Sequence, residues 1–463
     1  MAGLRNSDTI AAIATPPGTG GIGIIRISGP RAQAILQGVF TPSRPHAGLK
    51  SHTLYHGTVA DRDGLVLDEV LAVYMRAPRT YTREDIVELH SHGSFLVLSS
   101  ILAEVLHFGA RPAEPGEFTK RAFLAGRIDL TRAEAVIDLL RAKTRTGAEL
   151  AVSQLQGRLF QRVEEIRRGL VDILAVLEVA IDFPEDDIEL LDRDRLLAQL
   201  GERVEAPLAE LIAMADRGKI YREGITIVIA GLPNVGKSSL LNALLQEERA
   251  LVTPVPGTTR DTIEEIISIR GVPARLVDTA GIRTATEPVE ELGVQRARQK
   301  VREADLVLFM VDAAAPLSAE DLELYGSLGD AARIVVLNKI DLASPGALDA
   351  MGARFSDVRI VRISARNHAG LPALYDAVYS HIMGDSDVVL EREACAPNIR
   401  HRAVLEETMA GCGRLRQALV SGITVDLVAV EVQGALAGLG DIVGMTTPDE
   451  VLDKIFAEFC IGK

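Results

Sequence analysis

The chain has 463 residues, and at about 150 residues per domain this length predicts roughly three domains. Its 64 acidic and 50 basic side chains leave a net charge of −14, which argues against a globally basic nucleic-acid-binding surface but allows a local one. We expect neither a membrane span nor a secretory signal, because no long apolar run is present. Three cysteines, Cys395, Cys412 and Cys460, argue against a disulfide framework and fit a reducing cytosol, so a cytoplasmic protein is expected.

Residues 1–118 have a mixed α/β pattern. Short β-rich runs at 23–27 and 71–74 lie between Gly and Pro breaks and predict strands, and 86–106 is expected to be partly helical.

From about residue 119 the pattern becomes helical. Apolar residues recur in steps of three or four and predict one long amphipathic helix that ends before Pro184. These residues are Leu155, Leu159, Val163, Ile166, Leu170, Ile173, Leu177 and Ile181. Helical periodicity resumes over 196–215 and again over 388–459.

Between these helical segments lies an α/β pattern. Six short runs of apolar, often β-branched residues predict buried strands at 225–230, 263–269, 274–277, 306–311, 334–337 and 358–363. Helix-compatible segments separate most of them, so a largely parallel sheet is expected. The predicted fold class is therefore α/β and α: an N-terminal α/β domain (1–118) and a helical domain (119–221 and 384–463) interrupted by an inserted α/β domain (222–383).

A phosphate-binding loop is indicated at residues 231–238. The segment Gly-Leu-Pro-Asn-Val-Gly-Lys-Ser fits G-x-x-x-x-G-K-[ST], follows a predicted strand and precedes a helix-forming run. Backbone N–H groups of such a loop converge on phosphate oxygens. Lys237 is expected to bridge the β- and γ-phosphates, and Ser238 to bind Mg²⁺.

Three further motifs follow predicted strands in the order expected of a GTPase. The D-T-A-G motif at 278–281 supplies Asp278 for the Mg²⁺ shell and Gly281 for the γ-phosphate. In the N-K-I-D motif at 338–341, the Asp341 carboxylate can accept two N–H bonds from guanine, which adenine cannot offer. Ser364 and Ala365 suit a second base contact. The set predicts a Ras-like P-loop G domain that binds GTP.

Residues 253–261 are expected to form the first switch loop, with Thr259 as a Mg²⁺ ligand, and 281–293 the second. The expected GTP contacts are Asn234, Val235, Gly236, Lys237, Ser238, Ser239, Thr253, Pro254, Val255, Pro256, Gly257, Thr258, Thr259, Asp278, Thr279, Ala280, Gly281, Asn338, Lys339, Ile340, Asp341, Ser364 and Ala365.

GTP hydrolysis needs a side chain that positions the attacking water. Ras-like enzymes use a Gln directly after the D-x-x-G motif, where this chain has the apolar Ile282. Asn234, with the carbonyls of Thr253 and Val255, is a candidate K⁺ site that would replace an arginine finger. Glu290 is the candidate to reach the attacking water. The alternatives are a loop-stiffening side chain for Asn234 and an exposed switch charge for Glu290.

The chain resembles the MnmE (TrmE) family of tRNA-modification GTPases. The resemblance rests on the phosphate loop with Asn234, the T-x-x-x-G-T-T-R-D segment at 253–261, the D-T-A-G at 278–281 and the final F-C-I-G-K at 459–463. The N-terminal segment from Asp8 through Gly21 and the R-P-A-E-P-G-E-F-T segment at 111–119 also match, so the likeness spans 8–463.

The resemblance implies a K⁺-stimulated GTPase that works with the flavoprotein MnmG in a heterotetramer. Together they would add an aminomethyl or carboxymethylaminomethyl group to C5 of the wobble uridine of certain tRNAs, with a methylene-folate as carbon donor. It also implies homodimerisation through an N-terminal domain that binds a reduced folate (5,10-methylene- or 5-formyl-tetrahydrofolate).

The family's functional residues fall on definite positions of this chain. The implied K⁺ ligands are Asn234, Thr253, Val255 and Thr258, the implied Mg²⁺ ligands are Ser238 and Thr259, and the implied catalytic residue is Glu290. The implied folate contacts are Arg26, Glu88, Arg127 and Lys463, for which ordinary surface or structural charge is the alternative. Pro254 and Pro256 depart from the family pattern and stiffen the first switch loop.

Two features allow more than one interpretation. Cys460 is a candidate nucleophile or redox contact for the modification chemistry, or a small packing residue. A basic stretch, comprising Arg121, Arg127, Arg132, Arg141, Lys143 and Arg145, either contacts tRNA phosphates or forms a solvated helix face.

Two other functions remain open. A regulatory GTPase that binds only a ribosomal or protein partner would need the G domain but not the folate site or the C-terminal motif. A non-enzymatic scaffold with a vestigial G domain is disfavoured by the intact Lys237, Ser238, Asp278 and Asp341.

Overall fold

The computed structural model describes residues 8–44, 48–182, 192–248, 265–278, 299–355, 357–384, 395–421 and 424–463. The chain divides into two compact units. The first unit comprises Met1–Ile137, Phe160–Val204 and Glu407–Lys463, and the second comprises Asp138–Leu159 and Glu205–Glu406. The four segment boundaries expected from the sequence stay predictions.

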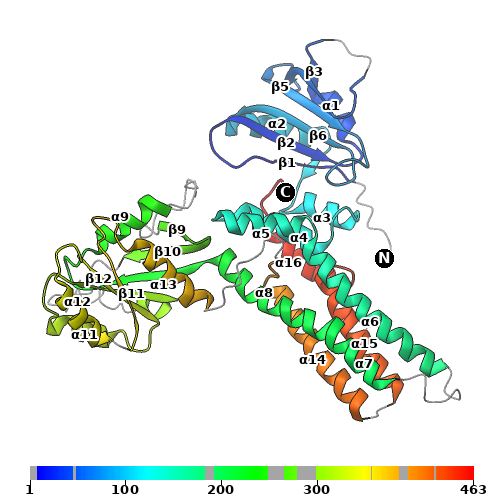
Figure 1. The fold of residues 1–463 in the computed structure, drawn as a ribbon. Coiled ribbons are helices and arrows are strands. Elements are labelled where there is room, and N and C mark those ends of the chain that lie inside the picture. The colour runs from blue at the N-terminus through cyan, green and yellow to red at the C-terminus, as the bar shows by residue number, and fades with distance from the viewer. Residues whose placement is uncertain are drawn as a thin grey trace. The chain divides into compact units, whose positions relative to one another are not determined.

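The first unit contains a seven-stranded sheet in the order β3-β4-β5-β6-β2-β1-β7 (Figure 1). The strands are β1 (Ile10–Ile13), β2 (Gly20–Ser28), β3 (Phe40–Pro42), β4 (Thr53–Ala60), β5 (Val66–Met75), β6 (Ile86–Gly93) and β7 (Arg111–Pro112). All neighbours are antiparallel except β1 and β7. Strand residues alternate between buried and accessible positions, and the buried ones pack against α1 (Ala32–Val39) and α2 (Phe95–His107). The expected partly helical stretch 86–106 is thus a strand followed by a helix.

Apart from the helices that pack on the two sheets, the described residues form α3 (Glu117–Leu124), α4 (Leu130–Arg141), α5 (Arg145–Leu155), α6 (Arg158–Asp182), α7 (Arg193–Leu200), the π-helical η2 (Gly201–Glu205), α8 (Ala206–Glu223), α14 (Ile399–Ser421), α15 (Val425–Val443) and α16 (Asp449–Ala457). Within the first unit, Leu130 of α4 packs with Leu452 and Phe456 of α16. Among the described residues, no helix is long and apolar enough to span a membrane.

The predicted long helix is interrupted, which corrects the sequence interpretation. Leu155 ends α5 and the rest of the apolar stripe belongs to α6. The break falls at Gly157, whose φ of 88° lies in the left-handed region that a helix cannot continue. The spacing of apolar residues in steps of three or four does not reveal a break of two residues, so the sequence pattern ran across it.

The second unit contains a six-stranded sheet in the order β13-β12-β11-β8-β10-β9. The strands are β8 (Ile225–Ala230), β9 (Glu265–Ile269), β10 (Val272–Asp278), β11 (Leu306–Asp312), β12 (Arg333–Asn338) and β13 (Arg359–Arg362). Only β9 runs antiparallel to its neighbour. A strand lies at each of the six predicted places, although residues 263 and 264 are outside the described ranges.

Helices cover both faces of this sheet, as parallel strands require (Figure 1). One face packs with α9 (Lys237–Glu248) and α13 (Leu371–Met383), and the other with α11 (Ala319–Ser327), α12 (Pro345–Gly352) and the 3₁₀ turn η3 (Ala353–Phe355). The inserted Ras-like α/β fold class is confirmed. In such sheets the loops after the strands' carboxyl ends form the ligand site.

Candidate functional site

The phosphate loop joins the end of β8 to the start of α9. Lys237 begins the helix, and its Nζ donates to the carbonyl oxygens of Gly231 and Leu232, each at 2.9 Å. Ser238 and Ser239 are exposed in the first helical turn, where free backbone N–H groups and the helix dipole favour an anion. The predicted loop therefore forms, and its open N–H groups lie at the carboxyl edge of the sheet.

Asn338, at the end of β12, joins the phosphate loop to the base-recognition loops. Its buried side chain donates from Nδ2 to the Val235 carbonyl at 2.8 Å and accepts at Oδ1 from the Ala365 N–H at 3.0 Å. Gly236 has a φ of 102°, and a Cβ there would lie 2.2 Å from Asn338 Nδ2. Three motifs that the sequence predicted separately are thus connected by one amide, a bridging role that sequence reasoning did not assign to Asn338.

Lys339 makes a second connection between the same loops. Its Nζ donates to the Asn234 carbonyl at 2.8 Å and pairs with Asp312 at 2.6 Å. Asp312 ends β11 and was missed by sequence analysis, although an acidic residue at the carboxyl end of a buried strand is a detectable signal. Asp341 is exposed two residues beyond Lys339, and the Ile340 N–H donates to the Ile363 carbonyl at 3.2 Å. Ser364 is buried in the next loop.

Several predicted residues fall outside the described residues. They are Thr253, Pro254, Val255, Pro256, Gly257, Thr258, Thr259, Thr279, Ala280, Gly281 and Glu290. The backbone of Asp278 ends β10 and pairs with Ile229 in β8, so it lies one strand from the phosphate loop at the same edge.

A second candidate site lies in the first unit, where Arg26 on β2 faces Glu88 on β6. The two residues are direct cross-strand partners, and Arg26 Nε and Nη2 each lie 2.9 Å from Glu88 Oε1. Glu88 Oε2 lies 3.3 Å from His90 Nε2. Both side chains are about one-fifth accessible, so the pair is partly desolvated but still reachable.

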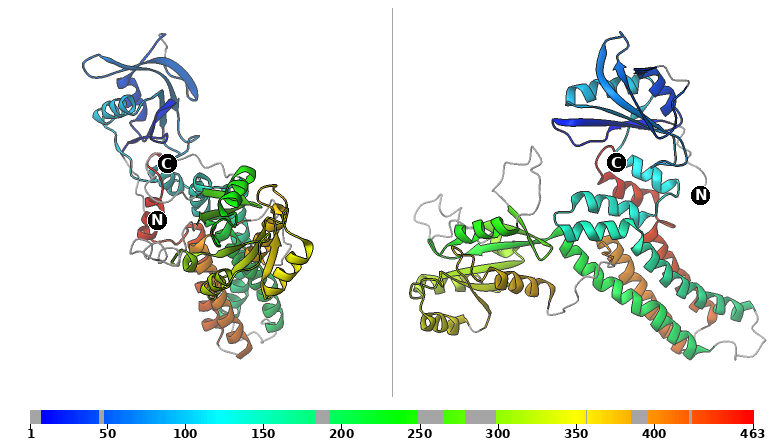
Figure 2. Two further views of the ribbon diagram at one scale, coloured as in Figure 1. Left: turned by 90° about the vertical axis from the view of Figure 1, so that its left-hand side faces the viewer. Right: turned by 45° about the horizontal axis from the view of Figure 1, so that its top comes forward.

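The C-terminal tail docks at this pair. Arg26 Nη1 donates to the Gly462 carbonyl at 3.1 Å, and the Phe118 N–H donates to the Lys463 carbonyl at 3.2 Å. Gly462 has a φ of 93°, and a Cβ there would lie 2.6 Å from the Ile13 carbonyl oxygen. Both views of Figure 2 have the C-terminus beside the N-terminal sheet. Cys460 is exposed next to this contact.

Arg127 reaches the same region through an aromatic neighbour. Its guanidinium lies 4.9 Å from the centre of the Tyr81 ring, and the Tyr81 hydroxyl lies 3.0 Å from Thr119 Oγ1. Thr119 follows Phe118 in α3, and the Arg26 guanidinium lies 5.8 Å from the Phe118 ring. The structure thus brings Arg26, Glu88 and Lys463 together, with Arg127 linked to them through α3.

Comparisons with known proteins identify the family of the chain. A family model described as the MnmE helical domain matches residues 130–460, and one described as the GTP-binding protein TrmE N-terminus matches 9–127. A protein of Desulfotalea psychrophila named tRNA modification GTPase MnmE is 53% identical over 462 residues, which is 99% of each chain. A protein of the same name from Syntrophotalea carbinolica is 47% identical and covers 99% of this chain and 100% of its own. The chain belongs to the MnmE family.

Among solved structures, Era of Aquifex aeolicus bound to GDP·AlF4⁻ is 28% identical and covers 40% of this MnmE-family chain and 66% of its own, with a TM-score of 0.30. The G domain of the FeoB transporter of T. maritima is 24% identical and covers 34% and 98%, with a TM-score of 0.28. The family and the strand order together identify this MnmE-family protein as a GTP-binding protein and a GTP hydrolase.

An ion-pair cluster in the MnmE-family N-terminal domain corrects one expectation. Arg121 belongs to the predicted basic stretch, yet it is buried and pairs with Asp8 and Glu117, each at 2.9 Å, and with Glu84 at 3.2 Å. Arg111 binds Glu117 through two nitrogens at 2.5 and 2.8 Å and Asp8 at 2.6 Å. Arg121 is therefore unable to contact RNA. This basic side chain is buried because three carboxylates compensate its charge.

The cluster shifts the ionisation of its acids. Burial alone raises the pKa of Glu117, but hydrogen bonds from Arg111, the Glu114 N–H and Arg121 outweigh it and hold the pKa below the usual value. The pKa of Asp8 is lowered in the same way, with Arg111 and Arg121 outweighing burial. Since Glu117 begins α3, the cluster fixes the segment whose Phe118 N–H holds the tail.

Proposed function

We propose that this MnmE-family chain couples GTP hydrolysis to modification of tRNA. With MnmG it would form a 5-aminomethyl or 5-carboxymethylaminomethyl group on the wobble uridine, using a methylene-folate carbon. The observation that carries the proposal is the hydrogen bond from Arg26 to the Gly462 carbonyl. This bond gathers the C-terminal motif and the charged pair of the N-terminal sheet into one site, which a GTPase acting only as a regulator does not need.

The folate part of the proposal fits the donors and acceptors present. Glu88 accepts from Arg26 at one oxygen and faces His90 with the other, and a carboxylate has about four acceptor positions. It can therefore also accept the N–H edge of a pterin. Lys463 and Arg127 carry positive charges that suit the carboxylates of a folate tail. When bound, a methylene-folate supplies the one-carbon unit, and Cys460 is a candidate for contact with it.

The nucleotide part of the proposal places GTP on the phosphate loop. Ser238 and Thr259 would hold Mg²⁺, and Asn234, Thr253, Val255 and Thr258 would hold K⁺. The fit is supported at Asn234, which is exposed in the loop with a φ of 63° and whose carbonyl is fixed by Lys339. A cation there supplies positive charge beside the phosphates. Glu290 is the proposed residue for the attacking water.

We further propose a cytoplasmic homodimer that assembles with MnmG into a heterotetramer and acts on tRNA. A purely regulatory GTPase is the second candidate. It is favoured only by the complete set of nucleotide-binding motifs in the G domain.

Folate binding to the full chain separates the two candidates. The full-length protein should bind 5-formyltetrahydrofolate, and Arg26→Gln should weaken binding at least about tenfold, because one charge-assisted hydrogen bond contributes roughly 1.5 kcal/mol or more. Arg76→Gln, a change of an exposed residue directly after β5, is the control and should leave the affinity unchanged. No binding by the wild type would contradict the folate site.

Nucleoside analysis of tRNA tests the outcome in cells. Cells lacking this chain should lose the C5-modified wobble uridine, and re-expression should restore it. Unchanged tRNA would leave the regulatory GTPase as the better interpretation.

The cation assignment is tested by GTP turnover. Turnover should be faster in K⁺ than in Na⁺, and Asn234→Ala should remove that difference while GDP binding persists. Glu290→Ala should keep GTP binding and lose most hydrolysis. Equal turnover of the wild type in the two cations would argue against the K⁺ site.

A further inference from the structure

The ion pair between Asp312 and Lys339 lies at the edge of the sheet that carries the nucleotide loops. Asp312 ends β11 and pairs in register with Asn338, the last residue of β12, so the two strands bring the carboxylate beside Lys339. Asp312 Oδ2 accepts from Lys339 Nζ at 2.6 Å, and its Oδ1 accepts from the Ala314 N–H at 2.9 Å. Both carboxylate oxygens are engaged, so the position of the negative charge is fixed.

Lys339 connects this carboxylate to the phosphate loop. Its Nζ also donates to the Asn234 carbonyl at 2.8 Å, so one ammonium bonds both groups. Lys339 and Asn234 have φ values of 64° and 63°, in the left-handed region that residues other than glycine rarely adopt and keep only where the surrounding structure holds them. The ammonium is therefore held one hydrogen bond from the residue that is proposed as a cation ligand.

The negative charge of Asp312 is not needed to hold Lys339 in place. An asparagine at this position would accept the same hydrogen bond through its amide oxygen. The carboxylate adds a charge that cancels the charge of the ammonium, and the side chains of Asp312 and Lys339 are only 25% and 31% exposed. Because partly desolvated charges are weakly screened, the net charge of this pair acts on ions that bind nearby.

We propose that Asp312 neutralises Lys339 so that a monovalent cation can bind at Asn234. The cation site itself belongs to the proposed function, on which this role of Asp312 rests. Without the carboxylate, an uncompensated ammonium would lie beside the site and repel a second positive charge. With the carboxylate, the pair has no net charge, and the oxygens of the loop can hold the ion. Asp312 acts through Lys339 and is not itself a ligand.

The size of the expected effect follows from the charge that is removed. A unit charge about 10 Å from a bound ion, at an effective dielectric constant of about 20, changes the affinity roughly tenfold. Asp312→Asn keeps the acceptor for Lys339 and removes the charge, so the K⁺ concentration at half-saturation should rise about tenfold. GDP is an anion, so its affinity should stay equal or increase. A carboxylate that only held the loop together would, on removal, weaken GDP binding instead.

Trapping of GDP by AlF4⁻ measures cation binding without turnover. The full-length protein with fluorescent GDP and Mg²⁺ is titrated with K⁺ at constant ionic strength, with choline as the balancing cation. The midpoint of the fluorescence change is compared between the wild type and Asp312→Asn, and GDP affinity is measured in parallel. The preference for K⁺ over Na⁺ should be the same in both proteins, because net charge does not distinguish ions of equal charge.

Neutralising Lys339 separates the effect of charge from that of geometry. At saturating nucleotide, Lys339→Gln leaves the pair with a net negative charge and should lower the K⁺ midpoint. Combining Lys339→Gln with Asp312→Asn restores neutrality and should return the midpoint to about the wild-type value. A double variant whose midpoint is as high as that of Asp312→Asn, or higher, would overturn the proposal.

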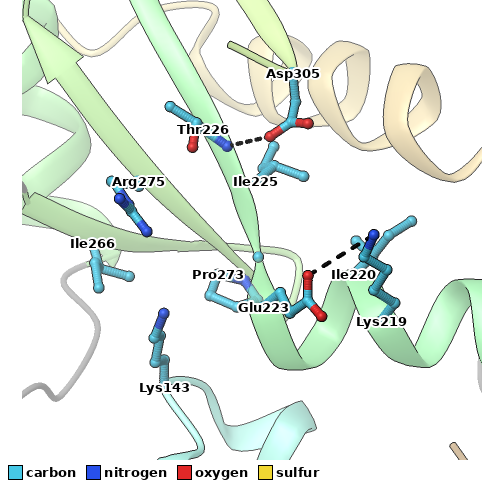
Figure 3. A pocket seen from close by; sticks show the side chains of 11 residues that line it. Lys143, Lys219, Ile220, Glu223, Ile225, Thr226, Ile266, Pro273, Arg275 and Asp305 are labelled. Carbon is cyan, nitrogen blue, oxygen red and sulfur yellow. Dashed lines mark hydrogen bonds and ion pairs between the residues drawn. The ribbon is translucent and has the colours of Figure 1, made fainter. Parts of the chain in front are cut away.

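A second lysine–carboxylate pair of the same unit provides the matched control. Lys219 and Glu223 lie 4.0 Å apart at the end of α8, just before β8 begins, whereas the phosphate loop follows the other end of that strand (Figure 3). The 6 residues of β8 span about 17–20 Å, more than the Debye length of about 8 Å at physiological ionic strength. Glu223→Gln should therefore leave the K⁺ midpoint unchanged, and an equal rise in Glu223→Gln and Asp312→Asn would overturn the proposal.

The wild-type titration distinguishes the role of Asp312 from the existence of the cation site. A midpoint that depends on K⁺ in the wild type but is unchanged in Asp312→Asn overturns the role of Asp312 and leaves the site standing. Trapping of GDP that does not depend on K⁺ in the wild type contradicts the cation site, and the role of Asp312 falls with it.

Discussion

Replacing Arg121 with Met should strongly destabilise the first unit. The Arg121 side chain is 3% exposed and forms ion pairs with Asp8, Glu84 and Glu117 at N···O distances of 2.9–3.2 Å. Met keeps most of the apolar stem but removes the charge, so three carboxylates lose a shared partner. Because breaking a buried ion pair from one side leaves uncompensated charge, the expected loss in the free energy of unfolding is about 3–5 kcal/mol.

The lower end of this range is expected for two structural reasons. Asp8 is 41% exposed and can regain water, which limits what its lost pairing costs. Glu117 is only 6% exposed, but it keeps both bonds from Arg111. The remaining loss of stability comes from the mutual repulsion of the carboxylates and from buried carboxylate oxygens that lack a hydrogen-bond donor.

The pH dependence has a definite sign. The folded-state pKa values of Glu117 and Asp8 are lowered, so these groups contribute stability that is present above their unfolded values near about 4 and lost as the pH falls through the folded values. Without Arg121 this contribution shrinks. The stability difference between wild type and Arg121→Met should therefore be largest near neutral pH and should narrow on acidification.

Guanidinium unfolding, read by hydrogen exchange of first-unit amides, measures this loss separately from the second unit. Arg414→Met is the matched control, because Arg414 is 61% exposed and pairs with Glu431 at 3.0 Å on the surface of the same unit. It should cost no more than about 1 kcal/mol. Equal losses in the two variants, or a difference that does not change with pH, would refute the reasoning.

Further predictions concern the two candidate sites. Asn338→Ala should weaken GDP binding about thirtyfold, because the two buried hydrogen bonds of this side chain contribute roughly 1 kcal/mol each. Asn367→Ala, a change of an exposed residue, is the control and should leave GDP binding unchanged. Equal dissociation constants of the two variants in a nucleotide titration would contradict the bridging role of Asn338. Gly462→Ala should undock the tail and weaken 5-formyltetrahydrofolate binding, because its Cβ would lie 2.6 Å from a backbone oxygen at a positive φ. Gly434→Ala, with open space around its Cβ, is the control, and equal folate affinities in the two variants would count against the docked tail.

The inserted domain could be predicted from the sequence because its signals are local. Each buried strand is a short β-branched run, and each ligand motif follows a strand end. The expected parallel pairing then brings those motifs to one edge without any further information. The helical region was harder, since the apolar stripe of α5 continues in α6 and a single glycine at 157 decides the break.

Contacts between distant residues were not predictable from patterns. The bond from Arg26 to Gly462 joins residues 436 positions apart, and its acceptor is a backbone carbonyl that leaves no trace in the side-chain sequence. The burial of Arg121 was likewise not predictable from the sequence, because the acidic residues that compensate its charge lie on three different segments. Composition assigns such a residue to the surface, and only the tertiary structure assigns it to the core.

Both candidate sites use the same physical device. In each, a basic side chain holds the backbone carbonyl of a segment that comes from far along the chain: Lys339 holds Asn234, and Arg26 holds Gly462. A charge-assisted bond to a carbonyl fixes a loop without requiring a particular side chain in that loop. The loop's own side chains and N–H groups therefore remain available for a ligand. This explains why Asn234 and Cys460 are exposed although the backbone around them is firmly attached.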